Sequence, residues 1–165
     1  MIRIPSLSVF LFPSSKASTG PIIVLTRLIV GFGFLQHGYA KVINGPAHFA
    51  ESLHGLGVPV PEIMGWMTIG AELICGAAML IGALVPLVCL PMAVILLVAM
   101  FTVHLPYGFS SVKLQAVTPN GITFGPPGYE VILLYLVSLL ALFLTGAGPL
   151  SVDSLLRKRF KLKQV

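Results

Sequence analysis

The sequence predicts an all-α, polytopic membrane protein: a bundle of four transmembrane helices with both chain termini in the cytoplasm. Of its 165 residues, 56% are hydrophobic and only 9% are charged, whereas a soluble domain carries about 25% charged residues. The mean hydropathy of +0.99 points the same way. These charges are too few to cover a water-facing surface, so composition excludes an ordinary soluble enzyme, and the length suits one compact bundle.

Apolar stretches of sufficient length account for the predicted spans, since about 20 apolar residues cross a bilayer. We expect the spans over residues 21–43, 63–85, 87–105 and 129–145. Small residues in the first two spans should allow close helix packing; they are Gly31, Gly33, Gly38, Gly70, Ala71, Gly76 and Ala77. A short amphipathic stretch over residues 47–56 should lie flat at the outer surface as a partial lid.

Basic residues beside the spans predict the orientation of the bundle. Arg3 and Lys16 lie in the amino-terminal arm, and five of the ten basic residues lie in the last nine positions. Cytoplasmic flanks are enriched in Lys and Arg. We therefore expect a cytoplasmic arm over residues 1–20, a transmembrane domain over 21–155 and a basic cytoplasmic tail over 156–165. Such a tail favours contact with anionic lipid over nucleic acid.

Ionisable side chains inside apolar segments are the best candidates for function, because a charge in hydrocarbon is costly unless it is paired or hydrated. Those in the half of the bundle predicted to face outward are His37, Lys41, Glu72, His104 and Glu130. From the rise of a helix, Glu72 lies deepest, about 14 Å from the outer end of its span. We expect a polar vestibule that opens outward and has Glu72 at its floor.

Glu72 needs either a partner or a proton, and His37 and Lys41 are the candidate partners. These two side chains share one face of the first helix, because residues i and i+4 are neighbours. A deep carboxyl beside an imidazole can relay protons, which makes the cluster a candidate proton or ligand site. A buried polar clamp that fixes helix register is the other interpretation, and the two do not exclude each other.

Other polar residues have simpler interpretations. Arg27 lies near the cytoplasmic end, where we expect it to reach lipid headgroups or to pair with Asp153. His104 is also typical of an interfacial anchor. The sequence contains no GxGxxG, Walker, HExxH or GxSxG motif, and it predicts no metal site. No cofactor signature is present; a quinone is the cofactor that an outward-facing vestibule would suit.

Three segments carry a family resemblance. They are RLIVGFGFLQHGYAKV, GAELICGAAMLIGAL and GYEVILLYLVSLLALFLTGAGPLSVD. Across about residues 26–155 the chain resembles the DoxX family of small bacterial membrane proteins with four helices. The residues that carry the resemblance are dispersed: Arg27, Gly31, Phe34, His37, Gly38, Lys41, Gly57, Pro59, Gly70, Glu72, Gly76, Gly82, His104, Glu130, Gly146, Gly148, Pro149, Ser151 and Asp153.

The resemblance implies a multi-pass protein of the bacterial inner membrane, of a family commonly described as oxidoreductase subunits. The family name comes from a thiosulfate:quinone oxidoreductase, but the family has no agreed catalytic residues, and fold transfers more safely than activity. One hypothesis is therefore the membrane subunit of a redox complex, linked to quinone and to sulfur or oxidative-stress chemistry. The alternative is a non-catalytic accessory or assembly subunit of a larger membrane complex.

A small-molecule permease is a third hypothesis, although neither inverted repeats nor broken helices, which mark that class, are evident in the sequence. The expected partners are the lipid bilayer and either partner subunits or further copies of this chain, without nucleic acid. The sequence does not name an electron donor.

Overall fold

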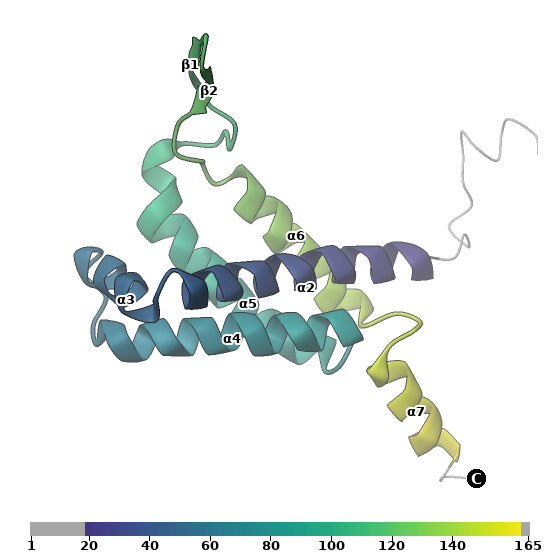
Figure 1. Cartoon of the computed structure of the whole chain (residues 1–165). Coiled ribbons are helices and arrows are strands. Elements are labelled where there is room, and N and C mark those ends of the chain that lie inside the picture. Colours follow the sequence, from purple (N-terminus) through teal and green to yellow (C-terminus); the bar gives the residue numbers. More distant parts are fainter. Residues whose placement is uncertain (1–18, 163–165) are drawn as a thin grey trace, which may run out of the picture.

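The computed structural model describes residues 19–162, with side chains described as far as residue 157. Helices dominate, and one small hairpin projects from them (Figure 1). In chain order the elements are α2 (Gly20–Ile43), α3 (Pro46–Gly55), α4 (Pro61–Ile81), α5 (Val85–Ala99), the π-helical η1 (Met100–His104), the 3-10 helix η2 (Leu105–Tyr107), β1 (Leu114–Thr118), β2 (Gly121–Phe124), α6 (Glu130–Thr145) and α7 (Val152–Leu162).

Within residues 19–162, three helical runs are long and apolar enough to cross a membrane: Gly20–Ile43, Pro61–Ile81 and Val85–Tyr107. The fourth apolar helix, α6, is shorter, with 16 residues. The second predicted span was too long at its end, because α4 stops at Ile81. Gly82 then adopts a left-handed backbone with a φ of 69°, which ends the helix at little steric cost for a residue without a Cβ.

The long helices associate in two pairs, α2 with α4 and α5 with α6, and the pairs cross each other (Figure 1). Glycines bring α2 and α4 together. A Cβ built on Gly31 would lie 2.9 Å from the carbonyl oxygen of Gly76, and one built on Gly76 would lie 3.0 Å from that of Gly31. Small residues let two backbones approach closely in a membrane, and these two glycines do so as predicted.

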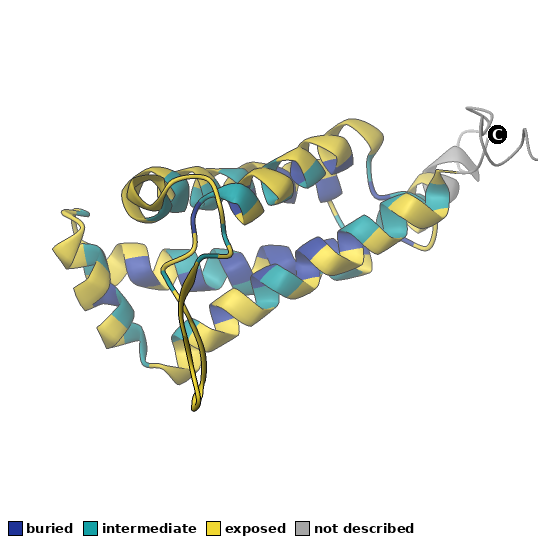
Figure 2. Cartoon of the chain, turned by 90° about the horizontal axis from the view of Figure 1, so that it is seen from above, coloured by how far each residue is buried: buried dark blue, intermediate teal, exposed yellow. Residues whose placement is uncertain are grey.

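The core lies along the faces where the helix pairs meet, while the outward faces are exposed (Figure 2). Large side chains such as Ile74 and Leu144 are more than 70% exposed, which is typical of a surface in contact with lipid. Buried apolar side chains from four helices form the core; they include Val30, Phe34, Met79, Val85, Met92, Leu139 and Leu142.

The two longer segments between the long helices, residues 44–60 and 108–129, lie at one end of the bundle, which we call the loop end. There α3, which contains most of the amphipathic stretch over residues 47–56, packs on α4, with Ala50 buried. Between η2 and α6 the chain forms the antiparallel pair β1 and β2. This hairpin is a correction to the all-α prediction, and the Asn120-Gly121 dipeptide at its turn is a typical signal for one. We call the opposite end, where α7 begins, the tail end.

We expect Gly31→Ala to destabilise the fold by about 1–3 kcal/mol, because the added methyl meets backbone atoms that cannot move independently. Unfolding by SDS titration in mild detergent, followed by circular dichroism, measures the change. Gly70→Ala is the matched control, since a Cβ at Gly70 has no heavy atom within 4 Å and alanine favours a helix. Equal stability losses for the two variants would contradict the close contact between α2 and α4.

Candidate functional site

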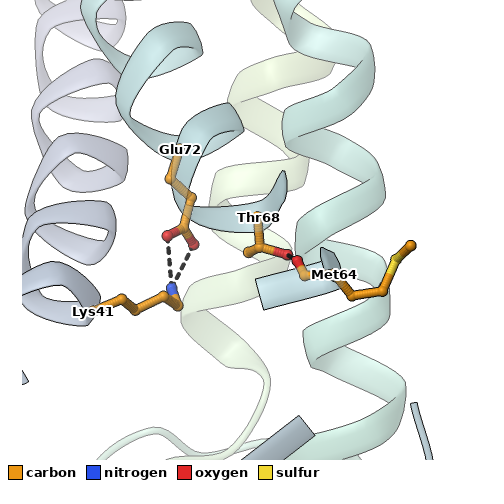
Figure 3. Close-up of polar contacts among 4 residues, drawn as sticks. All are labelled: Lys41, Met64, Thr68 and Glu72. Atoms are coloured by element: carbon orange, nitrogen blue, oxygen red, sulfur yellow. Dashed lines mark hydrogen bonds and ion pairs between the residues drawn. The ribbon is translucent and has the colours of Figure 1, made fainter. Parts of the chain in front are cut away.

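A buried ion pair connects the two closest helices. Lys41 of α2 places its Nζ 2.6 Å from Oε1 and 2.7 Å from Oε2 of Glu72 on α4, so the ammonium bridges both carboxylate oxygens (Figure 3). Glu72 is only 4% exposed. A buried charge is tolerated when it is paired and hydrogen-bonded, and Lys41 supplies both the opposite charge and the hydrogen bonds.

The neighbours of the pair explain how it is held. Gly38 lies one helical turn before Lys41, and a Cβ built on it would come within 3.1 Å of the Glu72 Cβ. The missing side chain therefore leaves room for Glu72 against α2. From α3, the ring of Phe49 has its centroid 5.0 Å from the Lys41 Nζ, in range of a cation–π contact. Thr68 donates to the carbonyl of Met64 at 2.8 Å, not to the carboxylate (Figure 3).

His37 is not part of this pair. Its side chain is exposed on α2, and none of the hydrogen bonds among residues 19–157 involves it. Of the two partners predicted for Glu72, the structure brings only Lys41 to the carboxylate. The arrangement of imidazole and carboxyl that would relay protons is therefore not assembled. The neighbouring amide of Gln36 is likewise exposed and makes no hydrogen bond within that same range.

His104 and Glu130 form a separate group at the loop end. The His104 Nδ1 lies 2.9 Å from the carbonyl oxygen of Pro127. The Glu130 Oε2 accepts the backbone N–H of Ser111 at 3.0 Å. Both side chains thus bind the segment that carries the hairpin to the ends of the helices. The five candidate residues therefore do not line one vestibule. Lys41 and Glu72 form the ion pair, His104 and Glu130 bind the loop before α6, and the His37 side chain lies on the exposed face of α2.

Arg27 and Asp153 make contacts at the tail end that the sequence did not reveal. Arg27 is 2% exposed, and its Nη1 and Nη2 donate to the carbonyls of Ala147 and Leu150 at 3.0 and 3.1 Å. The prediction that its guanidinium reaches lipid headgroups was wrong. Arginine donates in a planar fork, and here that fork binds carbonyls that follow α6.

Asp153, the predicted partner of Arg27, binds backbone groups instead. Its two carboxylate oxygens accept the N–H groups of Leu84 and Val85 at 2.8 and 3.1 Å. These groups begin α5, and the first N–H groups of a helix have no partner within the helix. Asp153 is therefore an N-cap supplied from a distant part of the sequence, and an aspartate alone gives no signal of which helix it will cap.

Two hollows in the described structure lie away from the ion pair. One, of about 260 Å³, lies between α5 and α6 and is lined by apolar side chains together with Cys89. The other, of about 290 Å³, lies where α6 leads into α7 and is lined by Asp153 and Arg157 among others. Neither is lined by Glu72, Lys41 or His37. No group of three or more His, Cys, Asp or Glu side chains within the described residues could hold a metal ion.

Long apolar helices and buried, paired charges define a multi-pass membrane protein. The chain belongs to the DoxX family, whose model matches residues 22–105. It is 29% identical over 149 residues to an uncharacterized protein of Haemophilus influenzae, covering 88% of this chain and 89% of that protein. It is 27% identical over 150 residues to an uncharacterized membrane protein of Mycobacterium tuberculosis, with 84% and 83% covered. No solved structure matches.

Removing one member of the ion pair should be worse than removing both. We expect Lys41→Met to cost about 3–5 kcal/mol of stability, because it leaves the buried Glu72 carboxylate unpaired. The double variant Lys41→Met, Glu72→Leu should recover part of that loss. SDS unfolding of the wild type, both single variants and the double variant gives the coupling energy, and purely additive effects would show that the pair does not hold the helices.

We expect Asp153→Ala to cost about 0.5–2 kcal/mol, the usual value of a lost N-cap. Glu62→Ala is the control, because Glu62 is an exposed acid in the first turn of α4, where no side chain caps the helix by a hydrogen bond. Thermal unfolding in detergent compares the two variants. An Asp153→Ala protein as stable as the Glu62→Ala protein would rule out a capping role.

Proposed function

We propose that this protein is a non-catalytic membrane subunit of a larger redox complex in the bacterial inner membrane, which it stabilises by helix packing. One observation carries the proposal: the charges buried in the bundle are engaged with one another or with the backbone. Lys41 and Glu72 bind each other, and Arg27 binds carbonyl groups. The redox assignment follows the description attached to the DoxX family, and electrons would pass through a cofactor of a partner.

Exposed polar groups on α2 support a partner inside the membrane. Ala40 lies four residues after Gln36 and three after His37, and all three are exposed, so they border one face of the helix. His37 is six residues from the end of α2, a depth of about 9 Å. An amide or imidazole without a hydrogen bond is costly in hydrocarbon, and side chains of these types commonly bond across transmembrane helices. We infer that a helix of a partner subunit covers this face.

The same proposal includes the topology. We infer that α6 is the fourth span and that both termini face the cytoplasm. With 16 residues, α6 is about 24 Å long, which is shorter than the hydrocarbon core, and a short span is accommodated by local thinning of the bilayer. The basic residues of the tail support the orientation. Labelling of single cysteines placed in the hairpin and at the carboxyl terminus, in intact cells, tests it.

A quinone-linked catalytic subunit is the second candidate. It is favoured by the position of Lys41 in the last turn of α2, with 22% of its side chain exposed, because an ion pair near the end of a helix lies close to protons in water. Neither of the two hollows described above adjoins this pair. We therefore assign no step of quinone chemistry to Glu72 or Lys41.

Purification in mild detergent from the native cells separates the two candidates. We expect co-purifying partner chains that are lost in the double variant Gln36→Leu, His37→Leu and retained in Glu72→Gln. Ser138→Ala is the control, because Ser138 is a half-buried polar residue on α6 whose hydroxyl bonds within its own helix. Absence of any partner chain would contradict the first candidate. Stoichiometric quinone that disappears in Glu72→Gln would establish the second.

A further inference from the structure

The hairpin at the loop end has one apolar face. In its register Val117 lies opposite Ile122 and Leu114 lies opposite Phe124. Opposed residues of an antiparallel pair share a face, and Ile122 and Phe124 are two residues apart, so these four side chains lie on the same side. We call them the apolar hairpin face. Each is between 58% and 69% exposed, so the rest of the described chain does not cover this face.

The composition of the hairpin is unlike that of a loop in water. No Asp, Glu, Lys or Arg occurs from Leu114 to Tyr129. A two-stranded hairpin by itself is marginally stable in water, and an exposed apolar patch usually marks a surface that something covers. The lack of charge favours a neutral, apolar environment over a charged protein surface.

The base of the hairpin is fixed where the helices end. The N–H of Glu130 donates to the carbonyl of Phe109 at 2.9 Å, and the rings of Phe109 and Tyr129 meet edge to face at 5.7 Å. Tyr107 ends the helical run of α5. Aromatic rings at the ends of transmembrane helices mark the boundary between membrane and water. The hairpin therefore starts at the level of the lipid headgroups.

We propose that the hairpin lies on the membrane and inserts its apolar face into the lipid interface of the leaflet at the loop end. The apolar side chains enter the boundary between headgroups and acyl chains, as those of interfacial elements do. Ala116 and Thr123, paired on the opposite face, stay toward water. Because the segment is uncharged, the binding depends on apolar burial and not on anionic lipid. This inference does not depend on the proposed function.

Tryptophan scanning tests the orientation. The chain has one tryptophan, Trp66, so Trp66→Phe gives a silent background in which Ile122→Trp probes the apolar face and Thr123→Trp probes the opposite face. Each protein is reconstituted into phosphatidylcholine vesicles with lipids that carry nitroxide quenchers at defined depths. We expect Ile122→Trp to be quenched severalfold more strongly by the shallow nitroxide, and Thr123→Trp to be quenched more strongly by acrylamide in water.

Two outcomes would overturn the proposal. Equal acrylamide quenching of both probes, without lipid quenching, would place the hairpin in water. Protection of Ile122→Trp from both quenchers would show that protein, either a second copy or a partner, covers the face. Val117→Trp and Ala116→Trp form a second matched pair, which keeps the test decisive if one substitution disturbs the turn.

Discussion

Close approach of α2 and α4 is the constraint on which the rest of the structure depends. At Gly31 and Gly76 the backbones of the two helices are in contact, and the absence of a side chain at Gly38 leaves room for Glu72. Only at this separation does Lys41 reach the carboxylate from the next turn of α2. The ion pair therefore depends on the close helix packing that the glycines allow, and it also stabilises that packing. In hydrocarbon, where water cannot compensate for a poor fit, the two features stabilise each other.

The charged residues serve different purposes along the bundle. Lys41, in the last turn of α2, and Glu72, midway along α4, neutralise each other across two helices. At the tail end, Arg27 and Asp153 bind backbone groups at helix termini, and at the loop end Glu130 binds the backbone of the connecting segment. In the described chain each of these groups therefore binds either an opposite charge or the backbone. These contacts explain how so apolar a sequence accommodates charges within the bundle.

The sequence was sufficient for the helices and for part of the site, and the limits have physical causes. Hydropathy located the long spans because length and apolarity are local properties. The depths estimated from helix rise predicted that Lys41 could reach Glu72. Helical periodicity could not show which side of α2 the helix α4 covers, so it did not predict that His37 is exposed. The Asp153 cap was not predictable, because its partners lie 68 and 69 residues earlier. The hairpin was missed because high overall apolarity outweighed a short turn signal. The quinone, the partners and the topology stay predictions.

The cap that Asp153 provides also affects the order in which the helices can fold during synthesis. Leu84, whose N–H it binds, has a φ of 52°, a left-handed backbone that is unfavourable for a residue with a side chain. The turn between α4 and α5 leaves the ribosome before the carboxylate that stabilises it, which is 68 and 69 residues further along the chain. The turn between α4 and α5 thus remains without its cap until α6 and the first turn of α7 have been synthesised.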